Sequence, residues 1–320
     1  DFVFAADCWI TPTVQCCTDV ILPIASFAER QSMVGTHYGA SPNMLGSVVD
    51  AVKVGETKGD LEIQYELGTR LNPGTYARFA NFEEFRAEFR MGNCGMTYEE
   101  LKEKVIYQRE VNYRKYETGR LRPDGQPGFN TPTGRVELYS TMFRQFGEDP
   151  LPYYMEPQLS PVSTPEIAEQ YPLVLTTGAR TYCYFHSEGK QIPYLREMNP
   201  DPLIEINPED ALKFGVTNGQ WVEVENSFGK VVLKAKVSQI VKPGVVHAQH
   251  GFWFPEKDAE EPSLYEVWRS NINELVPHKY IGKLGFGAPF KCLLCSVKPI
   301  AENYDTDMME VWDRFGKLVI

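Results

Sequence analysis

The arrangement of apolar and polar residues changes at about residue 172. Before this point the apolar residues fall into a few separate runs, and after it short apolar runs alternate with glycine-containing turns. Residues 2–6 and 19–23 are mainly apolar runs, typical of strands that are buried on both faces of a parallel sheet. Two strands are too few for such a sheet, and the sequence opens without a Met, directly on the first run. We therefore expect residues 1–35 to be the C-terminal edge of an α/β domain whose other strands precede this sequence.

The next segment combines loop and helix patterns. Residues 31–60 are rich in Gly, Ser and Asn, which favours loops, whereas residues 61–115 predict helices. Two helix starts carry capping patterns, Asn81 with Glu84 and Thr97 with Glu100. Aromatic residues follow at helical spacing, namely Phe82, Phe85 and Phe89. Such a stripe indicates packing in a core rather than a cofactor site.

Residues 117–172 are dominated by glycine and proline. A short apolar run after these turns, Val136–Tyr139, predicts one strand. Six prolines from residue 150 to residue 172 favour an extended linker. We therefore expect a mixed α+β segment that ends in a linker over residues 36–165.

Short strands with turns between them fill most of residues 166–320. The predicted strands cover residues 172–177, 202–206, 221–225, 230–237 and 244–249. A short helix follows the second strand, with Asn207 as N-cap, Pro208 in the first turn and Gly215 as the stop. Several short strands with one small helix and glycine turns predict a closed β-barrel.

The charge balance limits the classes of partner. The chain has 320 residues and a formal net charge of -11, whereas nucleic acids and anionic membranes require clustered Lys and Arg. No apolar run approaches the ~20 residues of a membrane span. We therefore predict no nucleic-acid partner and no membrane span. An anionic cofactor remains compatible, because backbone N–H groups and a few Arg can bind it inside an acidic protein.

The cysteines do not form a recognisable metal site. There are seven, and Cys16-Cys17 and Cys292-x-x-Cys295 lack the second pair that a tetrahedral zinc site requires. We therefore interpret them as buried thiols. Nucleotide-binding P-loop, zinc-protease and serine-hydrolase motifs are also absent from the sequence.

The segment from 202 to 246 is the most specific part of the sequence. It runs from Ile206-Asn-Pro-Glu-Asp-Ala through Gly215-Val, Gly219 and Val224-Glu-Asn226 to Val241-Lys-Pro-Gly-Val-Val246. This order of strand, capped helix, glycine turn and hairpin resembles the C-terminal double-psi β-barrel of the molybdopterin oxidoreductases, the dimethyl sulfoxide reductase family.

Three short stretches extend the resemblance to the cofactor. They are Leu175–Thr181 with His186-Ser187, Gln249–Trp253, and Ser270–Leu275. The resemblance implies that they contact the pterin and its pyrophosphate through Thr177, Gly178, Arg180, His186, Ser187, His250 and Asn273. Lys291 lies where the family closes its barrel and could neutralise phosphate. Packing alternatives remain open: a structural histidine at position 186, an aromatic corner at 249–253, a turn asparagine at 273 and an exposed lysine at 291.

The N-terminal residues add independent support. A strand that ends in Asp7, a Thr-rich loop from Thr11 and an apolar element from Asp19 to Pro23 resemble the edge at which the family binds one guanosine of its cofactor. The resemblance implies cofactor contacts by Asp7, Thr11 and Asp19, although Asp19 could equally be a cap or a surface charge. Thr131–Glu137 also matches a family element, with Arg135 in place of Lys.

The resemblance implies a division of labour within a larger enzyme. Residues 1–35 would close a Rossmann-like α/β domain, and residues 166–320 would form the molybdopterin dinucleotide-binding barrel. The full-length enzyme would carry molybdenum or tungsten on two molybdopterin guanine dinucleotides. It would catalyse a two-electron redox reaction or oxygen-atom transfer on a small substrate.

The family's metal ligand, and its [4Fe–4S] cluster where there is one, lie upstream. We therefore assign no metal ligand and no catalytic residue here, and expect this chain alone to be inactive. The rest of the same enzyme and an iron–sulfur electron-transfer subunit are the implied protein partners. Bacterial cytoplasm and periplasm both remain open as locations. So do the substrate, the metal, and a hydration or transhydroxylation on the same cofactor.

Two other functions compete with this one. A non-catalytic double-psi barrel module would bind peptides or substrates in an exposed groove and have no pterin affinity. The apolar element at 19–23 argues against it, because a bare barrel does not require a sheet edge upstream. A separate cofactor-binding or chaperone subunit would pair with another, metal-bearing chain.

Overall fold

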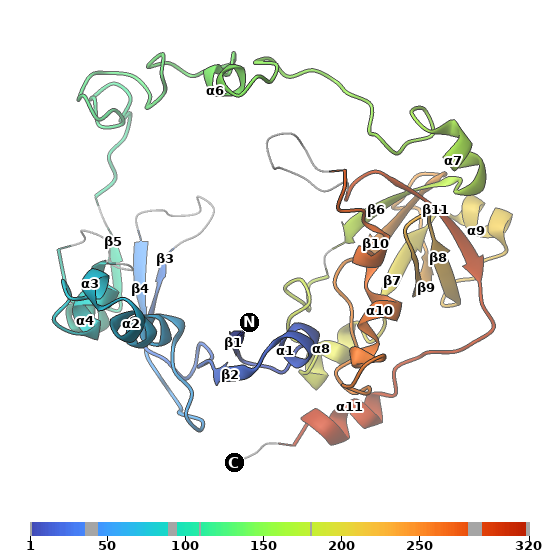
Figure 1. Ribbon diagram of the computed structural model, residues 1–320, viewed down its shortest axis with the longest axis horizontal. Helices are drawn as coiled ribbons and strands as arrows, with labels where there is room; N and C mark the ends of the chain where they lie inside the picture. The colour runs from blue at the N-terminus through green and yellow to red at the C-terminus, as the bar shows by residue number, and fades with distance from the viewer. Residues whose placement is uncertain are drawn as a thin grey trace. The chain divides into compact units, whose positions relative to one another are not determined.

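The computed structural model describes residues 2–35, 44–88, 95–108, 110–179, 181–280 and 290–317. The chain forms two compact units, Asp1–Thr141 and Met142–Ile320, whose elements are labelled in Figure 1. Across the described residues, no helix combines the length and the apolar character needed to span a membrane.

The first unit begins with a short parallel pair of strands. β1 (Phe4–Asp7) pairs with β2 (Val20–Pro23) in parallel, as the two apolar runs predicted. The connection between them contains α1 (Pro12–Cys17), where the sequence predicted only a loop. Thr11 caps this helix, and its Oγ1 accepts a hydrogen bond from the backbone N of Val14 at 3.3 Å. The result is a β–α–β unit of the expected α/β type.

A three-stranded antiparallel sheet follows, and the sequence analysis was wrong about it. β3 (Ser32–Gly35), β4 (Met44–Val48) and β5 (Ile106–Gln108) pair in that order, where loops and helices were predicted. The strands depend on tertiary packing: Leu45 packs against the buried side chains of α5 (Tyr98–Lys104). Packing of this kind overrides weak local propensity.

The predicted helix starts are confirmed. The other helices here are α2 (Asp60–Leu71), α3 (Pro73–Tyr76) and α4 (Phe82–Arg86). Asn81 caps α4, and Thr97 with Glu100 forms a reciprocal capping box at α5. Phe85 is buried among the rings of Tyr65, Tyr76 and Phe79. The aromatic residues therefore form a core, as predicted; Phe89 lies outside the described residues.

The strand predicted at Val136–Tyr139 is absent, and these residues form bends. The Glu137 carboxylate instead accepts hydrogen bonds from the hydroxyls of Thr133 and Thr141. An alternating run does not form a strand without a partner strand to bond to. The short helix α6 (Thr141–Gln145) precedes the predicted linker, but α7 (Pro165–Gln170) lies within it, so the prediction of an extended linker is wrong for these residues. Thr164 and Pro165 start this helix, because proline is favoured in the first turn.

The second unit is built on a closed six-stranded barrel. Its strands are β6 (Leu173–Ala179), β7 (Leu203–Ile206), β8 (Trp221–Glu225), β9 (Lys230–Val237), β10 (Val245–Gln249) and β11 (Leu293–Pro299). They close in the order β10-β6-β11-β8-β9-β7. The β6–β10 and β7–β9 pairs are parallel and the others antiparallel. The predicted barrel and overall fold class are confirmed, and β11 is a strand that the hydrophobic pattern had not supplied.

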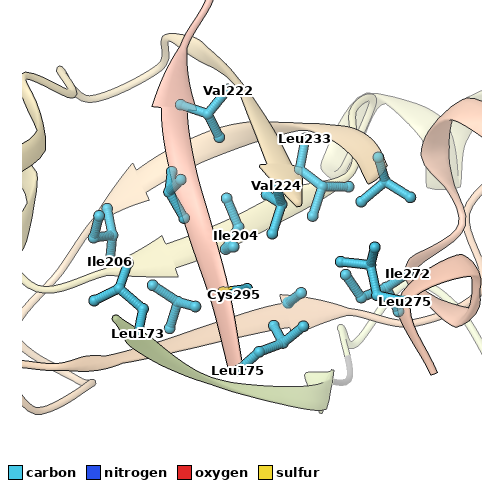
Figure 2. Packing of buried hydrophobic residues seen from close by; sticks show 14 of the residues in the cluster. Leu173, Leu175, Ile204, Ile206, Val222, Val224, Leu233, Ile272, Leu275 and Cys295 are labelled. Carbon is cyan, nitrogen blue, oxygen red and sulfur yellow. The ribbon is translucent and has the colours of Figure 1, made fainter. Parts of the chain in front are cut away.

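Apolar side chains fill the barrel and close one of its ends. Leu175, Ile204, Val224 and Cys295 point inward from four strands (Figure 2). Ile272 and Leu275 of the 3₁₀ helix η3 (Ile272–Leu275) join this core. α9 (Pro208–Phe214) begins at Asn207 and ends at Gly215, whose φ of 69° is left-handed. Both of its predicted boundaries are therefore confirmed.

The cysteines divide between core and surface. Cys183 and Cys295 are buried, and burial raises the pKa of the Cys295 thiol. Cys8, Cys16 and Cys17 are exposed, so the buried-thiol interpretation is wrong for them. It failed because α1 and its neighbouring strand are short and leave these side chains at the surface.

Further helices surround the barrel. They are α8 (Pro193–Met198), η2 (Leu264–Glu266), α10 (Val267–Ser270) and α11 (Met308–Phe315). Arg196 of α8 forms a fully buried ion pair with Glu256, at 2.9 Å. The same guanidinium donates to the hydroxyl of Thr306 at 3.1 Å. This pair ties α8 to the chain that leads into α11.

Candidate functional site

The ends of two neighbouring parallel strands form the floor of the candidate site. Ala248 of β10 lies opposite Thr177 of β6, but Gln249 lies opposite Ala179, so Gly178 is left over as a bulge. Its φ of 93° is a left-handed conformation that favours glycine. Polar residues therefore follow both strands at the same barrel end, where side chains can converge.

A cavity of about 410 Å³ opens beside this bulge, a volume within the range of small-ligand sites. Its lining includes the predicted residues Thr177, Gly178, His186, Ser187, His250, Asn273 and Lys291. The structure thus brings together every candidate of the barrel that it describes; Arg180 lies outside the described residues. Gly251 and Phe290 also line the cavity, and the sequence analysis did not single them out, although each directly follows or precedes a predicted residue.

Lys291 closes one side of the cavity. Its Nζ donates a hydrogen bond to the backbone O of Thr177 at 2.9 Å, and the Thr177 N donates to the O of Phe290 at 2.8 Å. A Cβ placed on Gly178 would lie 3.1 Å from Lys291 Nζ. The glycine therefore leaves the space that this ammonium group occupies.

Two histidines form another wall. His186 Nδ1 lies 3.0 Å from His250 Nε2, and their ring centroids are 4.9 Å apart. Only one nitrogen of such a hydrogen bond carries the shared proton, so the other must be unprotonated. His186 has a φ of 55°, a strained conformation for a non-glycine residue. The loop after β6 thus directs this imidazole towards the residue that follows β10.

Aromatic packing fixes the two loops that carry these residues. The Trp253 Nε1 donates to the backbone O of Ser187 at 3.3 Å. A Cβ on Gly251 would lie 3.2 Å from the Ser187 Cβ. Phe252 and Trp253 are buried. The aromatic residues therefore pack the barrel end, as the packing alternative predicted, while His250 and Gly251 line the cavity; contact of His250 with a cofactor remains a prediction.

Asn273 reaches the cavity from η3. The side chain of Asn271 caps this helix by accepting from the Asn273 N at 3.1 Å. The Asn273 carboxamide makes no hydrogen bond with any residue that the structure describes, so both its donor and its acceptor can serve a ligand.

The N-terminal candidates lie in the first unit and engage in local structure. Thr11 is the N-cap of α1, and Asp19 Oδ2 accepts from the Val3 N at 2.8 Å. Asp7 ends β1, and its Oδ1 accepts from the Trp9 N at 3.1 Å. Asp19 is therefore an exposed charge that bonds the chain before β1 and caps no helix among the described residues, and ligand contacts by the three residues remain a prediction.

The cavity is rich in hydrogen-bond donors. Its lining residues carry an ammonium, two hydroxyls, a carboxamide and two imidazoles, and no carboxylate lines it within the described part of the chain. Phosphate and carbonyl oxygens accept from such groups, and a nearby ammonium favours anions. The site therefore suits an anionic, oxygen-rich ligand.

Known proteins share this fold and sequence. The Molydopterin dinucleotide binding domain family matches residues 173–292, from the first residue of β6 to just before β11. Acetylene hydratase of Syntrophotalea acetylenica is 34% identical over 260 residues, which cover 81% of this chain and 34% of that protein. Dopamine dehydroxylase of Eggerthella lenta is 30% identical over an aligned region that covers 87% of this chain and 33% of that protein.

The solved structure of acetylene hydratase from Pelobacter acetylenicus matches with a TM-score of 0.80 at 27% identity. It covers 94% of this chain and 40% of that chain. The chain thus spans about a third of the length of the curated relatives it matches. Dimethyl sulfoxide reductases are also among its relatives, at 26% to 27% identity. Because the dinucleotide-binding pattern and the longer relatives converge on one group of proteins, this chain belongs to the molybdopterin oxidoreductases of the dimethyl sulfoxide reductase family.

Proposed function

We propose that the cavity beside Gly178 binds the pterin and pyrophosphate part of a molybdopterin guanine dinucleotide. The observation that carries this proposal is the donor-rich lining without a described carboxylate. The fit is also steric, because a Cβ at Gly178 would crowd the Lys291 ammonium. An anionic pyrophosphate and a pterin with several acceptor atoms are complementary to such a lining.

Each residue has a distinct part in this proposal. Lys291 neutralises phosphate charge, and Ser187 donates its hydroxyl to a phosphate oxygen. Asn273 pairs with both a donor and an acceptor of the pterin. His186 and His250 present a hydrogen-bonded imidazole edge. The sequence adds Arg180 to this set as a further positive charge.

One guanosine of the two-dinucleotide cofactor is proposed to lie against the β1–β2 edge. Asp7 is the strongest of the three candidates there. A carboxylate that follows a strand can accept a hydrogen bond from a guanine or ribose. Among the described residues the Asp7 carboxylate accepts one backbone hydrogen bond, through Oδ1. Thr11 and Asp19 would shape this edge through the cap of α1 and the bond to Val3.

The complete enzyme, in this proposal, carries molybdenum or tungsten on two such dinucleotides and catalyses two-electron redox or oxygen-atom transfer on a small substrate. The bound cofactor supplies the redox chemistry, and this chain binds, orients and electrostatically tunes it. The metal ligand and any [4Fe–4S] cluster would come from other residues of the enzyme, and electrons from an iron–sulfur subunit. Hydration is a second candidate, favoured by the 34% identity to acetylene hydratase.

The test is made on native extract from the source cells. The extract is separated by size, and molybdenum and tungsten are measured in the fraction that contains peptides of this chain. Co-elution of one metal with a polypeptide much longer than 320 residues is the expected result. Reduction of an added redox dye with substrate would then separate redox chemistry from hydration, which transfers no electrons.

Two other results would contradict this proposal, and each would favour a different function. A metal-free chain of this length alone would favour a non-catalytic barrel module. A metal-containing complex in which this chain and the metal-bearing chain are separate polypeptides would favour a dedicated cofactor-binding subunit.

A further inference from the structure

Lys190 is a buried amine next to the candidate site that the proposed function does not use. Its side chain is 1% exposed. The Nζ lies 4.0 Å from the ring centroid of Tyr184 and 4.3 Å from that of Phe252. It makes no ion pair or hydrogen bond with any residue in the described part of the chain. A buried cation held only by aromatic rings is uncommon and costs free energy unless it has a task.

The charges around Lys190 disfavour its protonated form. Arg196 lies against the same Phe252 ring, with its guanidinium carbon 5.4 Å from the centroid. The nearby carboxylate, Glu256, is already paired with Arg196. Burial, and secondarily the charge of Arg196, lowers the pKa of Lys190 to about 7, with a small opposite effect of Cys183. Both the amine and the ammonium are therefore populated near neutral pH.

A second, very small cavity connects Lys190 to the histidine pair. It has a volume of about 10 Å³, which is room for one water molecule. Its lining consists of the polar residues Lys190, Gln249, His186, His250 and Thr181 and the aromatic residues Tyr184 and Phe252. The same two histidines line the 410 Å³ cavity. The histidine pair therefore separates the buried amine from the candidate ligand site.

We propose that Lys190 is a positioning residue that exchanges a proton with the His186–His250 pair and so sets the charge at the wall of the ligand cavity. In this step one N–H bond of the Lys190 ammonium breaks and the proton passes through the bridging water. An N–H bond forms on an imidazole, the amine is left neutral, and the total charge is unchanged. The exchange depends only on this chain's residues; its use by a bound pterin rests on the proposed function.

The geometry also predicts a direction. The titratable groups that face Lys190 are Cys183, Tyr184, Arg196 and the two histidines, and Glu256 lies behind Arg196. An ammonium at position 190 repels an imidazolium in the pair, because the small cavity is poorly screened. Removal of this charge should therefore make the pair easier to protonate, and a permanent charge should make it harder to protonate.

The experiment is a histidine NMR titration of the 320-residue chain from about pH 5 to about pH 9. His186 and His250 are assigned with the H186Q and H250Q variants. Lys190→Met should raise the apparent pKa of the pair by about half a unit or more. Lys190→Arg, which keeps a positive charge at every pH of the titration, should not raise it. Lys213→Met, which removes an exposed lysine on α9, should leave the pair unchanged.

A pair that titrates identically in wild type, Lys190→Met and Lys190→Arg would overturn the proposal and leave Lys190 a packing residue. Melting curves check the fold, and Lys190→Gln serves as the neutral variant if Lys190→Met does not fold. No cofactor is needed, so a negative result leaves the pterin proposal standing. Conversely, a metal-free native enzyme would leave the lysine–histidine coupling intact.

Discussion

Single residues at the end of β6 combine a backbone requirement with a charge. Gly178 bulges out of the ladder with a left-handed φ, and Lys291 Nζ lies beside it, bonded to the carbonyl of Thr177. The ammonium is held by a backbone atom and not by a carboxylate, so its charge remains available to a ligand. This differs from Arg196, whose charge is matched inside the protein by Glu256.

Gly178→Ala should destabilise the chain and weaken cofactor retention. An alanine here would have to keep the left-handed φ, and its Cβ would crowd Lys291 Nζ. Together these two effects should lower the free energy of unfolding by about 2 kcal/mol. Denaturant unfolding and the metal content of the complete enzyme measure the two effects. Gly219→Ala is the matched control, because Gly219 has a φ of 81° with nothing within 4 Å of the added Cβ. Equal metal loss in both variants would argue against a specific role for Gly178.

Lys190 should make the stability of the chain depend on alkaline pH. Its pKa falls from an ordinary 10.5 to about 7 in the folded chain. Between these values the unfolded chain binds more protons, so the free energy of unfolding rises as pH increases from 7 to 10.5. Lys190→Met should lack this contribution and gain more stability at about pH 6 than at about pH 10. The measurement is the free energy of unfolding by denaturant across this pH range, with Lys213→Met as control. The claim is refuted if this free energy changes with pH in Lys190→Met as it does in the wild type.

At the scale of elements, the hairpin between β8 and β9 holds the helix that carries Asn273. The Asn226 side chain accepts from the backbone N of Phe228 and Gly229 and donates to the O of Leu275 at 2.9 Å. One buried asparagine thus shapes the turn and anchors η3. The position of a cavity residue is therefore set by a turn on another part of the barrel.

Asn226→Ala should loosen η3 without changing any residue of the cavity. Loss of its buried hydrogen bonds should destabilise the chain by about 2 kcal/mol. Hydrogen exchange of residues 271–276 should accelerate more than exchange of β6. Asn218→Ala, which removes one bond from an exposed side chain to the Val237 N, is the control. Equal acceleration of hydrogen exchange in β6 and in η3 would instead indicate global destabilisation.

Local signals predicted the elements with strong periodicity and missed those that depend on distant partners. β7 and α9 carry alternation, a cap and a stop within a few residues, so their bounds were predictable. β3, β4 and β5 depend on packing with α5, and their residues resemble a loop. The run Val136–Tyr139 alternates like a strand but has no partner strand.

In the candidate site, too, local motifs revealed some residues, whereas contacts with distant residues hid another. His186, His250 and Asn273 could be predicted because short motifs mark them, and Lys291 because of its place in the family pattern. Lys190 stands in a polar run, Glu188-Gly-Lys-Gln, that looks exposed. Its burial comes from Tyr184 and Phe252, and the latter lies 62 positions further along the chain. No local pattern could have revealed that contact.

For the molecule as a whole, the second unit contains a complete core of its own. The barrel closes on itself, and its buried cluster draws on strands, helices and connecting residues of this unit alone. A closed sheet leaves no unpaired edge, which favours independent folding.

Residues 142–320 expressed alone should therefore fold cooperatively and keep the histidine pair. A single sharp unfolding transition and histidine titrations equal to those of the 320-residue chain are the expected results. The same fragment with Val224→Asp, which places a charge in the core, is the unfolded control. Broad unfolding of the wild-type fragment would show that the first unit is needed.

The order of the barrel strands has a consequence for synthesis. The first and last strands of the barrel, β6 and β11, are neighbours, and the cavity lies where they meet, with Thr177 bonded to Phe290 and Lys291. On the ribosome, β6 emerges more than a hundred residues before its partner. A nascent chain that stops short of residue 290 has the histidines and the glycine but not the wall they require. In the proposed function, a cofactor held by Lys291 would therefore be bound only after this closing part of the barrel has been translated.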